Sequence, residues 1–367
     1  GLKMTNSKFN KLFGKKERID GEENLTEFHM DIAASIQNVT EEIILKISNS
    51  LREEYKIKNL CLAGGVALNC VANGKIIKNK IFDNVWIQPA ASDAGGSLGA
   101  ALAFWHIHLK NKRKIHIGKD NMKGSYLGPK YSQIEIEKEL KKLNAKFQIL
   151  SDEEIINKTS ERLIKGDAVG WFQGRMEFGP RALGARSILA DPRSESMQKN
   201  LNLKVKFRES FRPFAPSVLE EDANQWFDLE TISPYMLITC SVNDKIRIKL
   251  KNNENNYLGI EKLKAKRSTI PAVTHVDFSA RVQTVNKDTN KRFYELIANF
   301  KKISGCPVLI NTSFNVRGEP IVNTPQDAFK CFMGTNLDAL VIGNCLLKKN
   351  DQISSYKEDY QQKFAKD

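Results

Sequence analysis

The sequence predicts an α/β fold, because two units of strand, glycine turn and helix follow one another in its first third. The first unit runs from an apolar strand at residues 58–63, expected to be buried, through Gly64 and Gly65 into a helix. The second has a strand at residues 84–88, a glycine-rich turn at residues 92–96 and a further helix. Strands that alternate with helices favour a sheet covered by helices, with ligands at the carboxyl ends of the strands.

The remaining elements are predicted from the spacing of apolar residues. A long helix is expected at residues 27–55, where aliphatic side chains recur every three or four positions and form one apolar stripe. This stripe consists of Ile32, Ile36, Val39, Ile43, Ile47 and Leu51. Later in the chain, helices are expected near residues 132–143, 151–165, 289–304 and 325–333, and strands near residues 168–172, 235–242, 307–311 and 339–342.

The length of 367 residues favours two domains. A polar, basic stretch at residues 111–128 is expected to lie near their junction, so the first domain is placed at residues 1–115 and the second at 116–350. The lysine-rich tail at 351–367 is expected to be exposed. Because the sequence begins with Gly1 rather than Met, we expect a processed, truncated or incomplete product.

Composition argues against several classes of protein. No apolar run reaches the length of about 18 residues that a membrane helix needs, and the basic N-terminus lacks a signal peptide's apolar core, so we expect a cytoplasmic protein without membrane contact. The six cysteines show no CxxC spacing and lie mostly in apolar runs, which predicts buried, reduced thiols. The net charge of +14 suits nucleic acid or small anions. Because the excess lies in lysine-rich and asparagine-rich stretches without aromatics, an exposed basic surface is the favoured interpretation.

The two glycine turns are the first candidate ligand sites. Gly64 and Gly65 end a strand and begin a helix, where exposed N–H groups can bind phosphate; the alternative is a tight turn that only packs the helix. Asp93 stands at the end of the next strand beside Gly95 and Gly96, which let a ligand come close. This carboxylate could hold a metal, or it could cap the following helix.

A second candidate site is rich in arginine. Arg175, Arg181 and Arg186 are separated by glycines and a proline, directly after the apolar strand near residues 168–172. Guanidinium groups bind phosphate and carboxylate through two parallel hydrogen bonds, and glycines keep the backbone close to such a ligand. This spacing favours an anion site over a solvated run of charge.

Three further segments supply candidate residues. In the first, Lys206, Arg208 and Arg212 alternate with aromatic residues, which suits either an anion site or an amphipathic edge strand that points Lys206 and Arg208 to one side. In the second, Ser313 and Asn315 follow an apolar strand and could bind a nucleotide or cap a turn. In the third, at residues 271–277, His275 has polar neighbours in an otherwise apolar strand, where it could line a site or serve the structure.

These segments together resemble the nodulation- and antibiotic-type O-carbamoyltransferase family across residues 31–347. The most specific stretches are residues 173–184, 211–216 and 311–320, which occur in the family's order. The resemblance implies a partial actin-like ATPase-fold lobe, similar to the universal tRNA threonylcarbamoyl-transferase. This lobe would be followed by an α/β threonylcarbamoyl-AMP-synthase-like domain.

The resemblance also implies a reaction. The second domain would make carbamoyl-adenylate from carbamoyl phosphate and ATP with magnesium, and the first would transfer carbamoyl to the hydroxyl of a small molecule, using bound iron. Lys206 and Arg208 match the family's KxR element, and Ser313 and Asn315 match its SxN element. Gly64, Gly65 and Asn69 match the nucleotide loop, and Asp93 matches the metal-binding aspartate.

The family's first lobe carries an HxxxH metal-binding pair that this sequence lacks. We therefore expect the second lobe of the transfer domain plus a complete activation domain, with a missing lobe or a second copy of the chain as partner. The mechanistic hypothesis is electrostatic: cations gather the phosphates around one hollow and offset developing charge. They are Arg175, Arg181, Arg186, Lys206 and Arg208. Less favoured are a tRNA-modifying enzyme and a nucleotide-binding subunit without turnover.

Overall fold

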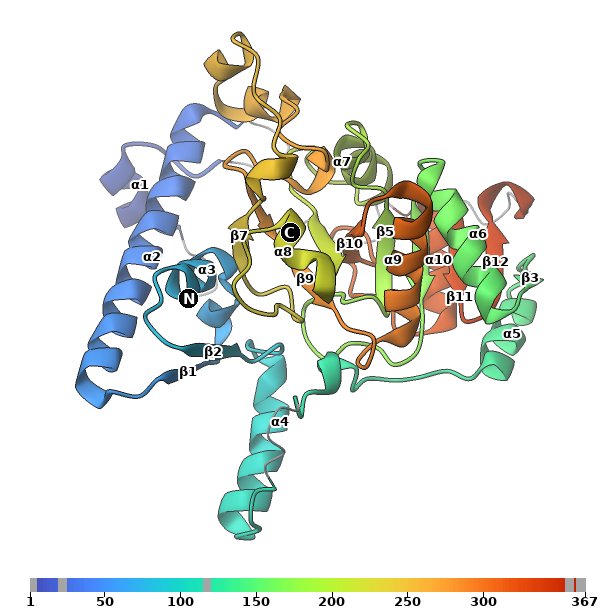
Figure 1. The fold of residues 1–367 in the computed structure, drawn as a ribbon, viewed down its shortest axis with the longest axis horizontal. Helices are drawn as coiled ribbons and strands as arrows, with labels where there is room; N and C mark the ends of the chain where they lie inside the picture. Colours follow the sequence, from blue (N-terminus) through green and yellow to red (C-terminus); the bar gives the residue numbers. More distant parts are fainter. Residues whose placement is uncertain (1–4, 19–24, 115–119, 354–359, 361–367) are drawn as a thin grey trace.

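The computed structural model describes residues 5–18, 25–114, 120–353 and 360. The first region contains a small parallel sheet of two strands, β1 and β2. The long helix α2 lies along this region and packs against α3 (Figure 1). Its elements are α1 (Ser7–Phe13), α2 (Glu27–Tyr55), β1 (Asn59–Leu62), α3 (Cys70–Lys78), β2 (Asn84–Ile87) and α4 (Ala94–Ala103).

The second region is built on a mixed sheet of eight strands in the order β3-β12-β11-β4-β5-β10-β6-β9. β4 pairs with β11, and β6 with β9, in parallel; the other neighbours are antiparallel. The strands are β3 (Gln148–Ile149), β4 (Val169–Phe172), β5 (Arg186–Ala190), β6 (Ala215–Leu219), β9 (Gln283–Val285), β10 (Val308–Ser313), β11 (Ala339–Ile342) and β12 (Cys345–Lys348). A separate antiparallel pair joins β7 (Thr239–Ser241) to β8 (Ser279–Arg281).

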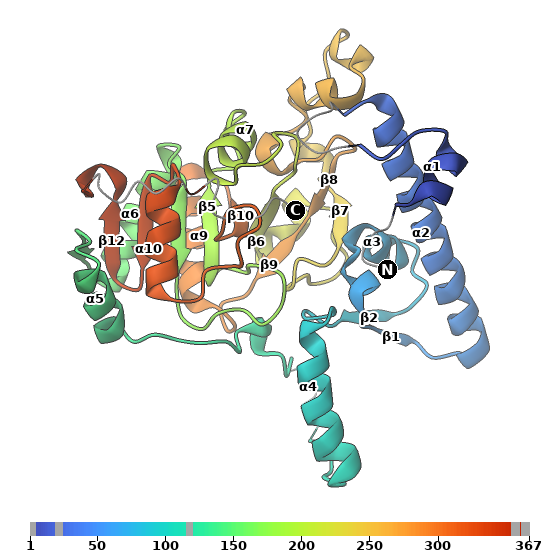
Figure 2. The ribbon, with the colours of Figure 1, turned by 180° about the vertical axis from the view of Figure 1, so that it is seen from behind.

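Helices cover both faces of the large sheet (Figures 1 and 2). α9 and α6 pack together on one face, and α10 packs against α5, β11 and β4 on the other. These helices are α5 (Gln133–Lys142), α6 (Asp152–Ile164), α9 (Lys291–Ser304) and α10 (Pro325–Gly334); two short helices are α7 (Met197–Asn200) and α8 (Ala223–Trp226). α5, α6 and α10 each begin with a capping box, in which a hydroxyl and an acidic side chain satisfy free backbone N–H groups.

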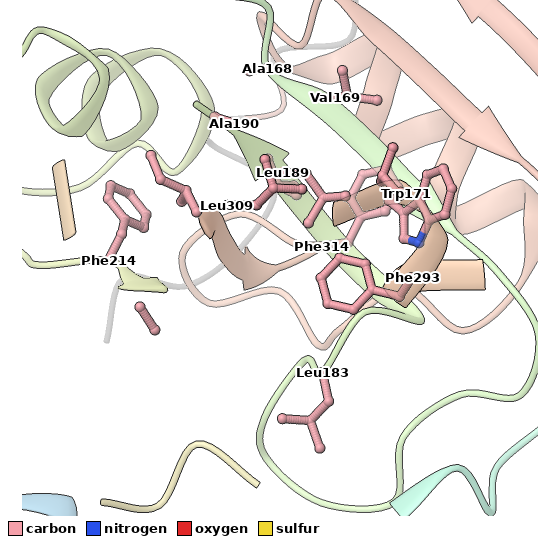
Figure 3. Close-up of a cluster of buried hydrophobic side chains, with 14 of the residues drawn as sticks. Ala168, Val169, Trp171, Leu183, Leu189, Ala190, Phe214, Phe293, Leu309 and Phe314 are labelled. Carbon is pink, nitrogen blue, oxygen red and sulfur yellow. The ribbon is translucent and has the colours of Figure 1, made fainter. Parts of the chain in front are cut away.

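The core lies between the large sheet and these helices and includes the fully buried Trp171, Phe293 and Phe314 (Figure 3). Trp171 donates its indole N–H to the carbonyl of Gly184 at 3.0 Å. Gly184 has a φ of +102°, and a Cβ there would lie 2.2 Å from Cδ1 of Phe293. The backbone of the arginine-rich segment is thus held directly against α9.

Apolar side chains of the first region are largely exposed. On α2, the predicted stripe faces outward at Ile36, Val39, Ile43 and Ile47, whose exposed fractions are 50–63%. α4 contains no buried residue and projects away from both sheets (Figure 1). None of the described helices combines the length and apolar composition that a membrane span requires.

The α/β class is confirmed, and helices α2, α5, α6, α9 and α10 begin and end within two residues of the predicted limits. Several local predictions were wrong. β1 is only partly buried, and residues 235–242 contribute just the three-residue β7. The edge strand considered around Lys206 is instead a helical turn that ends at Val205, followed by a left-handed Phe207 with a φ of 50°.

Two more predictions need correction. The stretch at residues 271–277 forms a 3-10 turn (Pro271–Val273) rather than a strand, with Pro271 at its first position, where the missing N–H costs no helical hydrogen bond. In the tail, Tyr360 is 4% exposed, and its ring packs against Gly334. The tail's other positions beyond residue 353 lie outside the described residues.

Candidate functional site

A cavity of about 500 Å³ lies where α3 meets the second region, and we call it the first cavity. α3 contributes Cys70 and Val71 to its wall. The second region contributes four cations: Arg181, Arg208, Arg212 and Arg281. Its other lining residues are Pro180, Ala182, Pro213, Phe214, Ala215, Met236, Thr239, His275, Asn311, Thr312 and Ser313.

Arg181 and Arg281 form the most unusual pair in this cavity. Both are half-buried, and in the described part of the chain neither guanidinium has a hydrogen-bond or ion-pair partner. Burial lowers the pKa of Arg181, and burial together with the charge of Arg181 lowers the pKa of Arg281 to about 10. Two neighbouring cations without an acceptor repel each other, so an anion between them would relieve both their repulsion and their lost hydration.

Arg208 and Arg212 are held by side chains of their own loop. The Nε of Arg208 donates to Oδ1 of Asn202 at 2.7 Å, and its guanidinium lies over the ring of Phe214. The Nε of Arg212 lies 2.9 Å from a carboxylate oxygen of Glu209. Burial, followed by the charge of Arg212, lowers the pKa of Arg208 to about 10. These contacts fix the direction of both cations before any ligand arrives.

Lys206, Ser313 and Asn315 form a buried hydrogen-bonded cluster behind the wall of the first cavity. Lys206 is 3% exposed, and its Nζ donates to Oδ1 of Asn315 at 2.8 Å and to Oγ of Ser313 at 3.1 Å. The Oγ of Ser313 donates to the same Oδ1 at 2.6 Å. Burial and the charge of Arg208 lower the pKa of Lys206 to about 7. Ser313 lines the cavity, whereas Lys206 supports it from behind.

His275 also lines the first cavity. Its Nδ1 lies 3.0 Å from Oγ of Ser279, which donates to Oδ1 of Asp277 at 2.7 Å. Burial lowers the pKa of His275, so the imidazole is disposed to be neutral. A neutral imidazole can offer one donor and one acceptor to a ligand.

The structure separates two predicted arginines from this cavity. Arg186 is fully buried and stacks on Phe172 at 3.5 Å, and its guanidinium directs all its described hydrogen bonds to backbone carbonyls. It cannot reach a ligand in the first cavity without losing them. Arg175 is exposed and lines a different cavity. The expected single hollow for all five cations is therefore divided.

The glycine turns of the first region do not line the first cavity. Gly64, Gly65 and Gly96 are exposed, and Gly95 packs on the carbonyl of Ala90. The Oδ1 of Asn69 caps α3 by accepting the N–H of Ala72 at 3.1 Å.

Asp93 is exposed, and the described residues contain no group of three or more His, Cys, Asp and Glu side chains that could hold a metal ion. This donor set does not fit a metal centre, so no step below involves one. As a metal ligand, Asp93 stays a prediction.

Arg281 and Asn202 are functional-site residues that were not predicted from the sequence. Arg281 ends the short strand β8. The sequence signal for it was a cation within a segment in which apolar and polar residues alternate. Asn202 is fully buried and fixes the loop by donating to the carbonyls of Ser210 and Arg212. The cysteine prediction was wrong for Cys61, which is exposed, and right for Cys306, Cys331 and Cys345, which are buried and free.

Comparison with known proteins gives two family matches. Residues 1–102 match the family described as carbamoyltransferase N-terminus, and residues 160–349 match carbamoyltransferase C-terminus. An uncharacterized protein of Synechocystis sp. is 53% identical over 370 aligned positions, which cover 100% of this chain and 60% of that protein. Nodulation protein NolNO of Sinorhizobium fredii is 41% identical, covering 88% of this chain and 45% of that protein. Nodulation protein U of Rhizobium tropici is 34% identical, and the match covers 76% of this chain and 41% of that protein. This chain thus spans about half the length of these relatives.

Proposed function

This chain belongs to the carbamoyltransferase family, and from that premise we propose that its first cavity forms carbamoyl-adenylate from carbamoyl phosphate and ATP. The carbamoyl group then passes to a hydroxyl of a small-molecule acceptor. In the first step, water splits carbamoyl phosphate into carbamate and phosphate. A carbamate oxygen then attacks the α-phosphorus of ATP, and pyrophosphate leaves.

The observation that carries this proposal is the pair Arg181 and Arg281. Their guanidinium groups face one cavity without an acceptor among the described residues. A phosphate placed between them would accept hydrogen bonds from both, and charge-assisted bonds of this kind are about twice as strong as neutral ones. Both substrates carry phosphates, so the pair suits either of them.

The remaining cations would act on the developing charge. Arg208 and Arg212 are fixed by Asn202 and Glu209, so they need little rearrangement when charge builds up on the reacting phosphate. Donors that are oriented in advance stabilise a transition state without the reorganisation that water requires. Removing one such donor in an enzyme typically slows the reaction by about 10²–10³-fold.

Ser313 and His275 would orient the substrates. The hydroxyl of Ser313, which lines the cavity, is held by Lys206 and Asn315, and these contacts limit its rotation. The imidazole of His275, disposed to be neutral by burial, would hydrogen-bond the carbamoyl or ribose group rather than pair with phosphate.

The proposal is tested by the exchange of labelled pyrophosphate into ATP, measured with the full chain and dependent on carbamoyl phosphate. We expect Arg181→Ala with Arg281→Ala to lower this exchange by at least about 10²-fold. Lys287→Ala, which removes an exposed cation that does not line the first cavity, is the matched control and should retain exchange. Undiminished exchange in the double variant would exclude this cavity as the adenylation site.

A further inference from the structure

A second cavity lies on the other side of the arginine-rich segment. It has a volume of about 900 Å³, and we call it the second cavity. Gly174 and Arg175 belong to its wall, whereas Pro180 and Arg181 of the same segment belong to the first cavity. The two cavities therefore share one loop but use different arginines.

Positive charge predominates around the second cavity. Lys130, Arg175, Lys291 and Arg292 come from three separate parts of the chain and all line it. The acidic lining residue, Glu135, accepts both the N–H and the hydroxyl of Ser132, each at 2.7 Å, within its capping box. Its charge is thus partly offset by the start of α5, and the cations outnumber it.

A buried cation adds to this potential. Arg186 lies beneath the wall and donates to the carbonyls of Gly174 and Pro129. Those carbonyls do not neutralise a full positive charge, and burial weakens its screening by water. The buried carboxyl of Glu177 lies near enough to interact with this charge, and burial raises the pKa of that carboxyl, so it offsets Arg186 only in its ionised form. Burial also lowers the pKa of Arg186, to about 10, which leaves the guanidinium charged at neutral pH. The field of Arg186 therefore favours an anion in the cavity above it.

The wall of the second cavity is held in place before any ligand binds. The N–H of Gly128 donates to the carbonyl of Met176, and the N–H of Met176 donates to the carbonyl of Pro129, both at 2.9 Å. Arg175 donates to the carbonyl of Gly128 at 3.1 Å. Arg292 donates to side-chain oxygens of Gln173 and Asn344, both at 3.0 Å, and forms an ion pair with Asp152 at 3.1 Å that offsets its charge.

The chemistry of the lining points to phosphate groups rather than to a base. The amide side chains in the lining could hydrogen-bond a nucleobase, but in the described part of the chain they already have hydrogen-bond partners. Gln133 accepts from the N–H of Asn344 and donates to Glu137, both at 2.9 Å. Asn290 donates to the hydroxyl of Tyr126 at 3.0 Å. Among the described residues, Lys130 has no hydrogen-bond or ion-pair partner and Arg175 contacts only the carbonyl of Gly128 through its side chain, so these two cations remain free to bind a ligand.

We propose that the second cavity is a separate binding site for a di- or triphosphate group. Pyrophosphate and the polyphosphate chain of a nucleotide both present this chemistry. Their binding here would not depend on whether the first cavity performs adenylation, so this inference stands apart from the proposed function.

The test is calorimetric titration of the full chain with pyrophosphate and, separately, with ATP, at low salt. The double variant Arg175→Ala with Lys291→Ala alters only exposed side chains, so we expect it to fold, as checked by its thermal unfolding. It should lose one of two pyrophosphate sites, or bind that site at least about tenfold more weakly. Arg181→Ala with Arg281→Ala should affect the other site alone. Lys245→Ala, which removes an exposed cation that lines neither cavity, is the control for general loss of charge.

Three results would overturn the proposal. The wild-type chain could bind a single pyrophosphate that only Arg181→Ala with Arg281→Ala removes. The Arg175→Ala and Lys291→Ala variant could bind with unchanged stoichiometry and affinity. ATP could occupy the second cavity while pyrophosphate does not, which would mean that the nucleoside, and not the phosphates, is recognised.

Discussion

The side-chain nitrogen of Lys206 donates to the amide oxygen of Asn315 at 2.8 Å across 109 positions of sequence. This contact joins the loop that follows α7 to the loop that follows β10. Both loops border the first cavity, through Arg208 on one side and Ser313 on the other. Lys206 therefore determines how the two halves of the wall meet, although it does not line the cavity itself.

The buried position of Lys206 predicts a pH-dependent stability. Its pKa is lowered from the ordinary 10.5 to about 7, so between these values the folded chain has released a proton that the unfolded chain still binds. Stability must therefore rise with pH across this window. Relative to Lys206→Met, the wild type should gain up to about 1.4 kcal/mol per pH unit.

Urea unfolding at pH 7 and pH 9 would measure this difference. Lys204→Met removes an exposed lysine two positions away and should show no such dependence on pH. A stability difference between wild type and Lys206→Met that stays constant over the window would contradict the argument.

Gly184→Ala should strongly destabilise the fold. The new Cβ would meet the ring of Phe293 at 2.2 Å on a backbone with a φ of +102°, so both overpacking and strain apply. We expect a loss of about 3 kcal/mol or more in the free energy of unfolding. Gly166→Ala has a φ of +90° but no atom within 4 Å, and should cost only about 1–2 kcal/mol. Equal losses in the two variants would show that the contact with Phe293 is unimportant.

Gly74→Ala tests how α3 closes the first cavity. A Cβ at this position would lie 2.2 Å from the carbonyl oxygen of Thr239, so α3 must move away from β7. Cys70 and Val71 would move with it, and pyrophosphate affinity at the first cavity should fall by about tenfold. Gly99→Ala, on the exposed α4 with no atom within 4 Å, is the control. Unchanged affinity in calorimetry would show that α3 does not shape this cavity.

The substitution Arg186→Lys tests whether Arg186 stabilises the fold rather than binding a ligand. Lysine cannot reproduce a planar group that stacks on Phe172 and donates to several carbonyls at once, so those oxygens would lose partners inside the protein. We expect a loss of about 3 kcal/mol in urea unfolding. Arg175→Lys, at an exposed position, should stay within about 0.5 kcal/mol of wild type. Similar stability of both variants would return Arg186 to the set of ligand-binding candidates.

Local patterns in the sequence predicted what depends on local physics. α5, α6 and α10 carry their own start signals in Ser132, Ser151 and Thr324, and their apolar spacing predicted the helices within two residues. β5 and β6 were missed because both are buried on both faces, which removes the alternation that marks a half-exposed strand.

The site was harder to predict than the helices because residue type alone does not specify a role. Arg181 and Arg186 lie five positions apart in one motif, yet one faces a cavity and the other is enclosed by carbonyls. Arg281, the neighbour of Arg181, is 100 positions away in the sequence. The pair is visible only in the folded chain, where Arg281 at the end of β8 lines the same cavity as Arg181.

The contribution of α3 to the first cavity has a practical consequence for dividing this protein into pieces. A shortened protein that starts near residue 116 would keep Arg181 and Arg281 but lose the wall supplied by Cys70 and Val71. Its arginines would then face open solvent, where water and salt compete freely for them. Enzymology on such an excised piece would underestimate how tightly the intact chain holds its anionic ligands.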